Sequence, residues 1–131
     1  MVSDNRTIEE RRTILVLDDE SALQIVLTRL LEGEGFRVVT AGCGSEALAT
    51  LAAHSERVAM MIVDVKLPDM CGREFVHHAA ARHGERPILY VSGVEPEGRS
   101  DFLHERTTFL AKPFHNAELL SRVSELLAET G

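Results

Sequence analysis

The chain has 131 residues, a formal net charge of −7 and 44% hydrophobic side chains. This length suits one domain, and the apolar content is too high for a disordered chain. No stretch approaches the roughly 18 apolar residues that span a bilayer, and the first residues form no apolar signal segment. Because neutralising phosphates takes concentrated lysine and arginine, the acidic balance argues against direct nucleic-acid binding. We therefore expect a cytoplasmic protein that contacts neither nucleic acid nor membrane.

The first half of the chain alternates between two kinds of hydrophobic pattern. Residues 1–12 are polar and predict a tail. Residues 13–17 form a continuous apolar run, which is typical of a strand buried on both faces of a parallel sheet. Leucine and valine at helical spacing over 23–31 then predict a helix, and the mixed run 36–40 predicts an edge strand. A second helix is expected to begin at Ser45.

The same alternation continues beyond residue 58. The apolar runs 59–63 and 87–91 predict two more buried strands, and the intervening pattern predicts a helix over 72–83. The pattern over 95–105 is weak, since proline, glycine and serine interrupt it. We expect a short or mobile helix in that stretch, the fourth of five along the chain.

The last elements are a mixed strand over 107–111 and a leucine-rich helix over 119–127, followed by a tail at 129–131. Five strands that alternate with helices predict an α/β protein, a doubly wound parallel sheet with helices on both faces. In such open sheets, ligands bind beyond the carboxyl ends of the strands. Chemistry is therefore expected directly after each strand.

Polar side chains follow four of the five predicted strands. Asp18 and Asp19 follow the first strand, Asp64 the third, Ser92 the fourth and Lys112 the fifth. Because parallel strands end at one edge of the sheet, these groups are expected to converge. The edge would hold three carboxylates, one hydroxyl and one ammonium group.

Charge decides what such a cluster can do. Neighbouring carboxylates raise one another's pKa, and a hard divalent cation such as Mg²⁺ relieves their repulsion. A bound Mg²⁺ keeps positions open for phosphoryl oxygens, and an aspartate beside it can attack phosphorus. Lys112 and Ser92 could then contact the phosphoryl oxygens. The cluster predicts phosphoryl transfer onto an aspartate.

Four segments carry a resemblance to a known family: residues 15–20 (LVLDDE), 63–72 (VDVKLPDMCG), 91–93 (VSG) and 109–114 (FLAKPF). In this order and at strand ends, they resemble the receiver domains of bacterial two-component response regulators. The resemblance implies a flavodoxin-like fold with five strands in the order 2-1-3-4-5 and five helices. Residues 13–128 would form the receiver domain.

The resemblance also implies roles for individual residues. Asp64 would be the phosphoacceptor and would ligate Mg²⁺ together with Asp19, with Asp18 acting largely through water. The backbone carbonyl of Lys66 would be a further metal ligand, and Lys112 would contact the phosphoryl group.

Further roles concern signalling and structure. Ser92 would be the switch hydroxyl, and Phe109 the aromatic residue that turns inward after phosphorylation. Pro68, Gly72 and Pro113 would be structural, and the bond before Pro113 is usually cis in the family.

One position departs from the residue common in the family, and two others occupy positions that set the rate of dephosphorylation. Phe109 stands where a tyrosine is common, so no phenol hydroxyl is available there. Lys66 and Val94 occupy the two positions that tune dephosphorylation, and neither suits the orientation of a hydrolytic water. We expect a long-lived phosphoryl state, although the charge of Lys66 could equally hold the phosphoryl group by itself.

The implied function is signalling. A sensor histidine kinase or a histidine phosphotransfer protein would phosphorylate Asp64, and a protein-interaction surface would change in response. Nineteen residues follow Lys112, too few for an output domain. The chain would be a stand-alone receiver or a receiver from a hybrid kinase or larger regulator. It would be a monomer or a phosphorylation-dependent homodimer, and no turnover enzyme.

Three other functions share parts of this pattern. An aspartate-nucleophile phosphohydrolase would have Asp-x-Asp after the first strand, where this chain has DDE at 18–20. A flavodoxin-like flavin binder would have a loop rich in serine, threonine and glycine there, because two aspartates repel the flavin phosphate. A degenerate receiver used only for docking would not need Asp64, Ser92 and Lys112.

Overall fold

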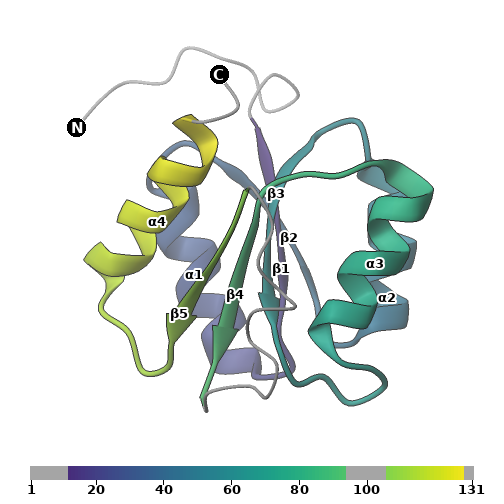
Figure 1. Cartoon of the computed structure of the whole chain (residues 1–131). Helices are drawn as coiled ribbons and strands as arrows, with labels where there is room; N and C mark the ends of the chain where they lie inside the picture. The colour runs from purple at the N-terminus through teal and green to yellow at the C-terminus, as the bar shows by residue number, and fades with distance from the viewer. Residues whose placement is uncertain (1–11, 94–105, 129–131) are drawn as a thin grey trace.

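A computed structural model describes residues 12–93 and 106–128. Within these residues the chain forms five strands and four α-helices (Figure 1). In chain order they are β1 (Thr13–Leu17), α1 (Ser21–Glu32), β2 (Arg37–Ala41), α2 (Gly44–His54), β3 (Val58–Asp64), α3 (Gly72–His83), β4 (Ile88–Ser92), β5 (Thr107–Ala111) and α4 (Asn116–Ala128).

All five strands form one sheet in the order β2-β1-β3-β4-β5, and every neighbouring pair is parallel. This confirms the flavodoxin-like α/β fold and the predicted strand order. The two runs with mixed polarity are the edge strands β2 and β5. The three continuous apolar runs are the central strands, because a central strand of a covered sheet is buried on both faces.

The helices lie in two layers, one on each face of the sheet (Figure 1). Helices α1 and α4 cover one face, and α2 and α3 cover the other. Alternate side chains of β1, β3 and β4 point to opposite faces and divide the core into two apolar clusters. Leu15, Met61 and Phe75 belong to the cluster under α2 and α3, and Val16, Leu27 and Leu119 to the cluster under α1 and α4.

The observed bounds agree with the predicted elements to within a few residues. The strand at Thr13–Leu17 and the helix at Gly72–His83 coincide with the predicted ranges. The described residues contain four helices, not the five predicted. The remaining predicted helix, between β4 and β5, was expected over 95–105, which lies outside the described residues. The two predicted tails also lie almost wholly outside them. None of the four described helices is long and apolar enough to cross a membrane.

The edge strand β5 is fastened to the last helix by one arginine. Arg122 of α4 donates from Nη1 to Thr108 Oγ1 and to the carbonyl oxygen of Phe109, both at 3.2 Å. The amide of Lys112 bonds to the carbonyl of Ser92 at the end of β4. Lys112 therefore directs its backbone groups toward β4. Phe109 lies an odd number of residues from Lys112, so its backbone groups point to the free edge of the sheet. Arg122 thus donates to the Phe109 carbonyl oxygen, which points to the free edge of the sheet.

Candidate functional site

Three aspartates meet where β1 and β3 end, at the lower edge of the sheet in Figure 1. One carboxylate oxygen from each of Asp18, Asp19 and Asp64 lies within 4.8 Å of the others. Asp18 is 1% exposed and Asp64 is 6% exposed, whereas Asp19 is open to solvent. The sequence prediction that the strand ends bring these acids together is confirmed.

Lys112 reaches into this cluster from the end of β5. Its Nζ donates to Asp18 Oδ2 at 2.8 Å and to Asp64 Oδ2 at 3.3 Å. It also donates to Glu20 Oε1 at 3.3 Å. Burial alone would lower the pKa of Lys112, but the hydrogen bond to Asp18 and the charges of Asp18 and Asp64 outweigh it and raise that pKa. The ammonium group is therefore firmly charged and lies beside the proposed phosphoacceptor.

Backbone groups fix the two buried carboxylates. The amide of Lys66 donates to Asp64 Oδ1 at 3.0 Å, and the amide of Glu20 donates to Asp18 Oδ1 at 2.9 Å. Gln24 reaches back from α1 and donates to the carbonyl of Asp18 at 2.7 Å. Each carboxylate thus has one oxygen on a backbone amide and the other on Lys112. Their orientation is fixed by main chain from two different loops.

The pKa of Asp64 is raised above its ordinary value, and burial is the main cause. The charge of Asp18 raises this pKa further, while the Lys66 amide and the Lys112 ammonium lower it. The folded state therefore holds the Asp64 proton more tightly than the unfolded state does. Ionisation of Asp64 costs folding free energy, even with Lys112 beside it.

This raised pKa gives a testable pH dependence. The penalty is absent below the ordinary pKa of 3.8 and develops as the pH rises through the raised value. Asp64→Asn cannot ionise, so in a chelating buffer we expect it to gain free energy of unfolding over the unmodified protein as the pH rises. Urea denaturation of both proteins from about pH 4 to about pH 7 measures this difference. Parallel stability curves for the two proteins would contradict a raised pKa for Asp64.

The donor set suits a hard divalent cation. Two buried carboxylates and one exposed carboxylate supply oxygen ligands, which Mg²⁺ prefers to nitrogen or sulfur. The Lys66 backbone lies next to Asp64, while its side chain is exposed. The residues present therefore fit magnesium, with Asp18, Asp19, Asp64 and the Lys66 carbonyl as the groups that would hold it.

Ser92 and Phe109, the predicted switch pair, lie on β4 and β5. Ser92 is the last residue of β4, is buried, and its carbonyl accepts from the Lys112 amide at 2.8 Å. Phe109 is 8% exposed and stacks on Tyr90, its partner across the strands, with ring centroids 5.2 Å apart. The aromatic side chain thus lies inward, against the core under α3. Sequence reasoning did not foresee the Tyr90 stack.

The three residues expected to be structural lie around the same edge. Pro68 is exposed in the loop between β3 and α3, and the bond between Lys112 and Pro113 is cis, as the resemblance implied. Gly72 begins α3 directly behind Asp64. A Cβ at Gly72 would lie 2.5 Å from the carbonyl oxygen of Asp64. Only glycine allows α3 to start this close to the strand end.

We expect Gly72→Ala to destabilise the fold by about 2 kcal/mol, because the added methyl group meets backbone that cannot move without shifting Asp64. Chemical denaturation measures the loss. Gly42→Ala is the matched control, since a Cβ there would make only an ordinary contact at 3.9 Å with Gln24. Equal stability of the two variants would show that the Gly72 contact relaxes without cost.

Three contacts of the site escaped sequence reasoning. Glu20 is only the last letter of the motif at residues 15–20, yet it binds Lys112. Gln24 carries no motif, although it lies one helical turn after Glu20. Asp69 accepts hydrogen bonds from the start of α2, a partner about 25 residues away that no local pattern indicates. Val94, the second position expected to tune dephosphorylation, lies outside the described residues.

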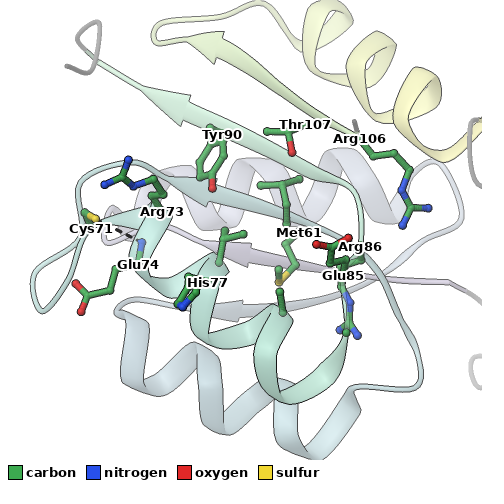
Figure 2. A pocket seen from close by; sticks show the side chains of 14 residues that line it. Met61, Cys71, Arg73, Glu74, His77, Glu85, Arg86, Tyr90, Arg106 and Thr107 are labelled. Atoms are coloured by element: carbon green, nitrogen blue, oxygen red, sulfur yellow. Dashed lines mark hydrogen bonds between the residues drawn. The ribbon is translucent and has the colours of Figure 1, made fainter. Parts of the chain in front are cut away.

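A separate groove lies between α3 and the strands β4 and β5 (Figure 2). It has a volume of about 830 Å³, and its lining includes Met61 and Tyr90 as well as Arg73, Arg86 and Arg106. None of the acidic site residues lines it. We assign no ligand to this groove, because the chain between β4 and β5 lies outside the described residues and nothing shows what covers it.

The fold and the site define a doubly wound α/β protein with an acidic cluster and a lysine at the carboxyl edge of its sheet. Residues 14–124 match the family model of the response regulator receiver domain. The chain therefore belongs to the response regulator receiver family of two-component signalling. Domains of this family are generally phosphoacceptor signalling modules rather than turnover enzymes, and they bind Mg²⁺ at an acidic pocket.

Individual relatives support the same assignment. The chain is 32% identical over 127 residues to the probable transcriptional regulatory protein TcrX of Mycobacterium tuberculosis, a match that covers 91% of this chain and 51% of TcrX. It thus spans about half the length of such curated relatives. Chemotaxis protein CheY4 of Vibrio cholerae superposes with a TM-score of 0.80 at 28% identity, over 89% of this chain and 99% of CheY4.

A third similar structure is the complex of CheX and CheY with BeF3 and Mg²⁺ from Borrelia burgdorferi. It superposes with a TM-score of 0.80 at 25% identity, over 88% of each chain.

Proposed function

We propose that this receiver takes a phosphoryl group onto Asp64 from a phosphohistidine on a sensor kinase or phosphotransfer protein, in a magnesium-dependent reaction. The convergence of Lys112 with Asp18 and Asp64, at 2.8 and 3.3 Å, carries the proposal. Structural ion pairing alone does not explain why three acids surround one cation at the edge where ligands bind in this fold.

The chemistry follows from the contacts of Asp64. A carboxylate oxygen of Asp64 attacks phosphorus, the phosphorus–nitrogen bond breaks, and the donor histidine, protonated on its other ring nitrogen, leaves as neutral imidazole. Bound Mg²⁺ would supply positive charge for the phosphoryl oxygens. Lys112 supplies the second positive charge, already within 3.3 Å of the Asp64 oxygen, and the Lys66 amide holds the other oxygen. Catalysis is then mainly positioning and electrostatics.

Similarity to the Borrelia CheY supports the metal and the phosphoryl site. That protein is in complex with BeF3, which stands in for a phosphoryl group, and with Mg²⁺. The present chain offers three carboxylates and an ammonium group at the strand ends, which suit a hard cation and phosphoryl oxygens. It therefore has the groups to accept both.

The response to phosphorylation would pass through β4 and β5. The phosphoryl group adds a charge of about −2 and strong acceptor oxygens beside Ser92. Ser92 would move toward it, and the Phe109 ring, stacked on Tyr90, would settle into the space that Ser92 leaves. A two-state repacking of this kind shifts populations and needs no new fold.

The direct experiment is to incubate the protein with acetyl phosphate and measure its intact mass. We expect one phosphoryl group per chain in the presence of MgCl2 and none in a chelating buffer. The modification should map to Asp64 and be labile, as an acyl phosphate is. Phosphate uptake that is indifferent to the chelator, or that maps to another residue, would contradict the proposal.

The protein donor is expected to dock over α1. Ile25 and Val26 are the exposed large hydrophobic residues of the part of the chain that the structure describes, at 52% and 46% exposure. They lie on the helix that begins just after the acidic pair. An apolar patch beside a reactive site is typical of a protein contact.

We expect Ile25→Glu to slow transfer from a phosphorylated kinase or phosphotransfer protein by about tenfold, since it buries a charge at the contact. Transfer from acetyl phosphate should be unchanged. Ala52→Glu, an exposed position on α2 across the sheet, is the control. A parallel loss with both donors would mean that the substitution damages the site itself and not the docking surface.

Two settings fit this function, a stand-alone receiver and a receiver within a hybrid kinase or larger regulator. In either setting we propose that the chain acts through protein contacts, as a monomer or as a phosphorylation-dependent homodimer, without binding nucleic acid. Sedimentation of the protein with and without phosphorylation distinguishes the two oligomeric states.

A further inference from the structure

The loop between β3 and α3, residues 65–71, is fastened to a helix on the same face of the sheet. Asp69 Oδ1 accepts from the amide of Gly44 at 2.8 Å, and Asp69 Oδ2 accepts from the amide of Ser45 at 2.9 Å. These amides belong to the first turn of α2, where backbone donors have no partner within the helix. One carboxylate therefore caps α2 and ties the loop to it.

A second contact closes the same junction. A Cβ built on Gly44 would lie only 2.5 to 2.7 Å from the Met70 side chain, so Met70 fills the space that a larger residue would occupy. Two adjacent loop residues, Asp69 and Met70, thus both contact the start of α2. Met70 also packs against the core cluster under α2 and α3.

The other end of this loop is part of the acidic site. The Lys66 amide donates to Asp64 Oδ1, and Lys66 forms an antiparallel bridge with Cys71. The amide of Gly72 bonds the carbonyl of Val65 at 2.7 Å, which closes the loop at its base. A loop closed at its base and tied at its tip has little freedom to shift Lys66.

Charge reinforces the tie. The two backbone hydrogen bonds from Gly44 and Ser45 lower the pKa of Asp69, so its carboxylate is ionised at neutral pH. A negative charge is favourable at a helix N-terminus, where the backbone dipoles carry partial positive charge. An amide side chain at position 69 would keep one acceptor oxygen and lose both the second acceptor and the charge.

We propose that Asp69 is a positioning residue for the acidic site: by capping α2 it holds the loop that carries Lys66, and thereby sets the affinity of the site for magnesium. The inference rests on the proposed magnesium-dependent function, since it gives the Lys66 carbonyl a ligand's role. Asp69 itself is exposed and is not one of the three clustered carboxylates. It acts on the metal only through the position of Lys66.

The test is a titration with MgCl2 alone, without a phosphodonor, followed by the backbone amide resonances of Val65 and Lys66. For Asp69→Ala we expect half-saturation at about tenfold higher magnesium, as when an outer partner of a metal ligand is lost. Asp69→Asn should lie between Asp69→Ala and the unmodified protein, because it keeps one acceptor oxygen. Hydrogen exchange of the Lys66 amide should accelerate in the same order.

Ala49→Gly is the matched control for a purely structural effect. Ala49 is exposed in the middle of α2, so glycine there destabilises the helix without touching the loop. If Ala49→Gly weakens magnesium binding as much as Asp69→Ala does at an equal loss of melting temperature, the inference is overturned. Unchanged binding in both Asp69 variants overturns it as well.

These outcomes separate the inference from the proposed function. If the unmodified protein binds magnesium without taking up phosphate, the proposed function fails, and the Asp69 comparison still decides the inference. If it takes up phosphate and the Asp69 variants bind magnesium normally, only the inference fails. If it binds no magnesium, both fail. Asp69→Asn keeps the test decisive should Asp69→Ala not fold.

Discussion

Asp64→Asn is expected to reduce phosphate uptake from acetyl phosphate by at least about a hundredfold, to the background level. Asparagine has nearly the same shape and keeps one oxygen for the Lys66 amide, so the loop need not move. Its amide, however, is no nucleophile toward phosphorus. Intact mass spectrometry after incubation with acetyl phosphate and MgCl2 measures the loss.

The control for this variant is another carboxylate changed to its amide. Glu56→Gln removes an exposed charge that lies outside the acidic cluster and should leave phosphate uptake unchanged. Thermal unfolding should show that Asp64→Asn is folded, and in chelating buffer at neutral pH more stable than the unmodified protein. Full phosphate uptake by Asp64→Asn would show that a different residue accepts the phosphoryl group.

Lys112→Ala is expected to act on signalling and on stability together. It should still accept phosphate, since Asp64 and the metal ligands remain, but more slowly, because one of the two positive charges is lost. It should also fail to pass the change to β5. Removal of the ammonium also leaves Asp18 and Asp64, both nearly buried, without their shared cation. Because an unbalanced buried charge is costly, we expect a loss of about 3 kcal/mol in free energy of unfolding, partly restored by MgCl2.

The measurement compares amide spectra of Ser92 and Phe109 before and after phosphorylation. Both resonances should shift in the unmodified protein, while in Lys112→Ala they should stay in place. Arg57→Ala provides the control, because it removes an exposed cation outside the acidic cluster and should keep both the shifts and the stability. If Ser92 and Phe109 respond normally to phosphorylation in Lys112→Ala, Lys112 is not needed to pass the signal to β5.

The elements of this fold and the position of its site could be predicted from sequence because both follow from short patterns. Continuous apolar runs separated the central strands from the edge strands, and polar residues directly after the strands located Asp64 and Lys112. Contacts within the site could not be predicted in the same way. Lys112 and Asp18 are 94 positions apart, and the choice of Asp18 as the nearest partner depends on burial and side-chain geometry.

The Asp69 contact shows the same limit more sharply. An acidic residue after a proline in a loop is ordinary, and nothing within a few residues marks it as the cap of a helix. Its partners, Gly44 and Ser45, become neighbours only when α2 and α3 pack on the same face of the sheet. Tertiary packing decides this contact, so short-range patterns are silent about it.

The guanidinium of Arg122 has a consequence for how other proteins can recognise this molecule. A foreign peptide that extended the sheet would need the outward-facing backbone acceptors of β5, and the one at Phe109 is already taken. Strand addition at this border would therefore have to displace a charged hydrogen-bond donor first, a common natural guard against edge-to-edge aggregation. We expect binding partners to contact the side chains near the free edge of β5 and not to form backbone hydrogen bonds with that strand.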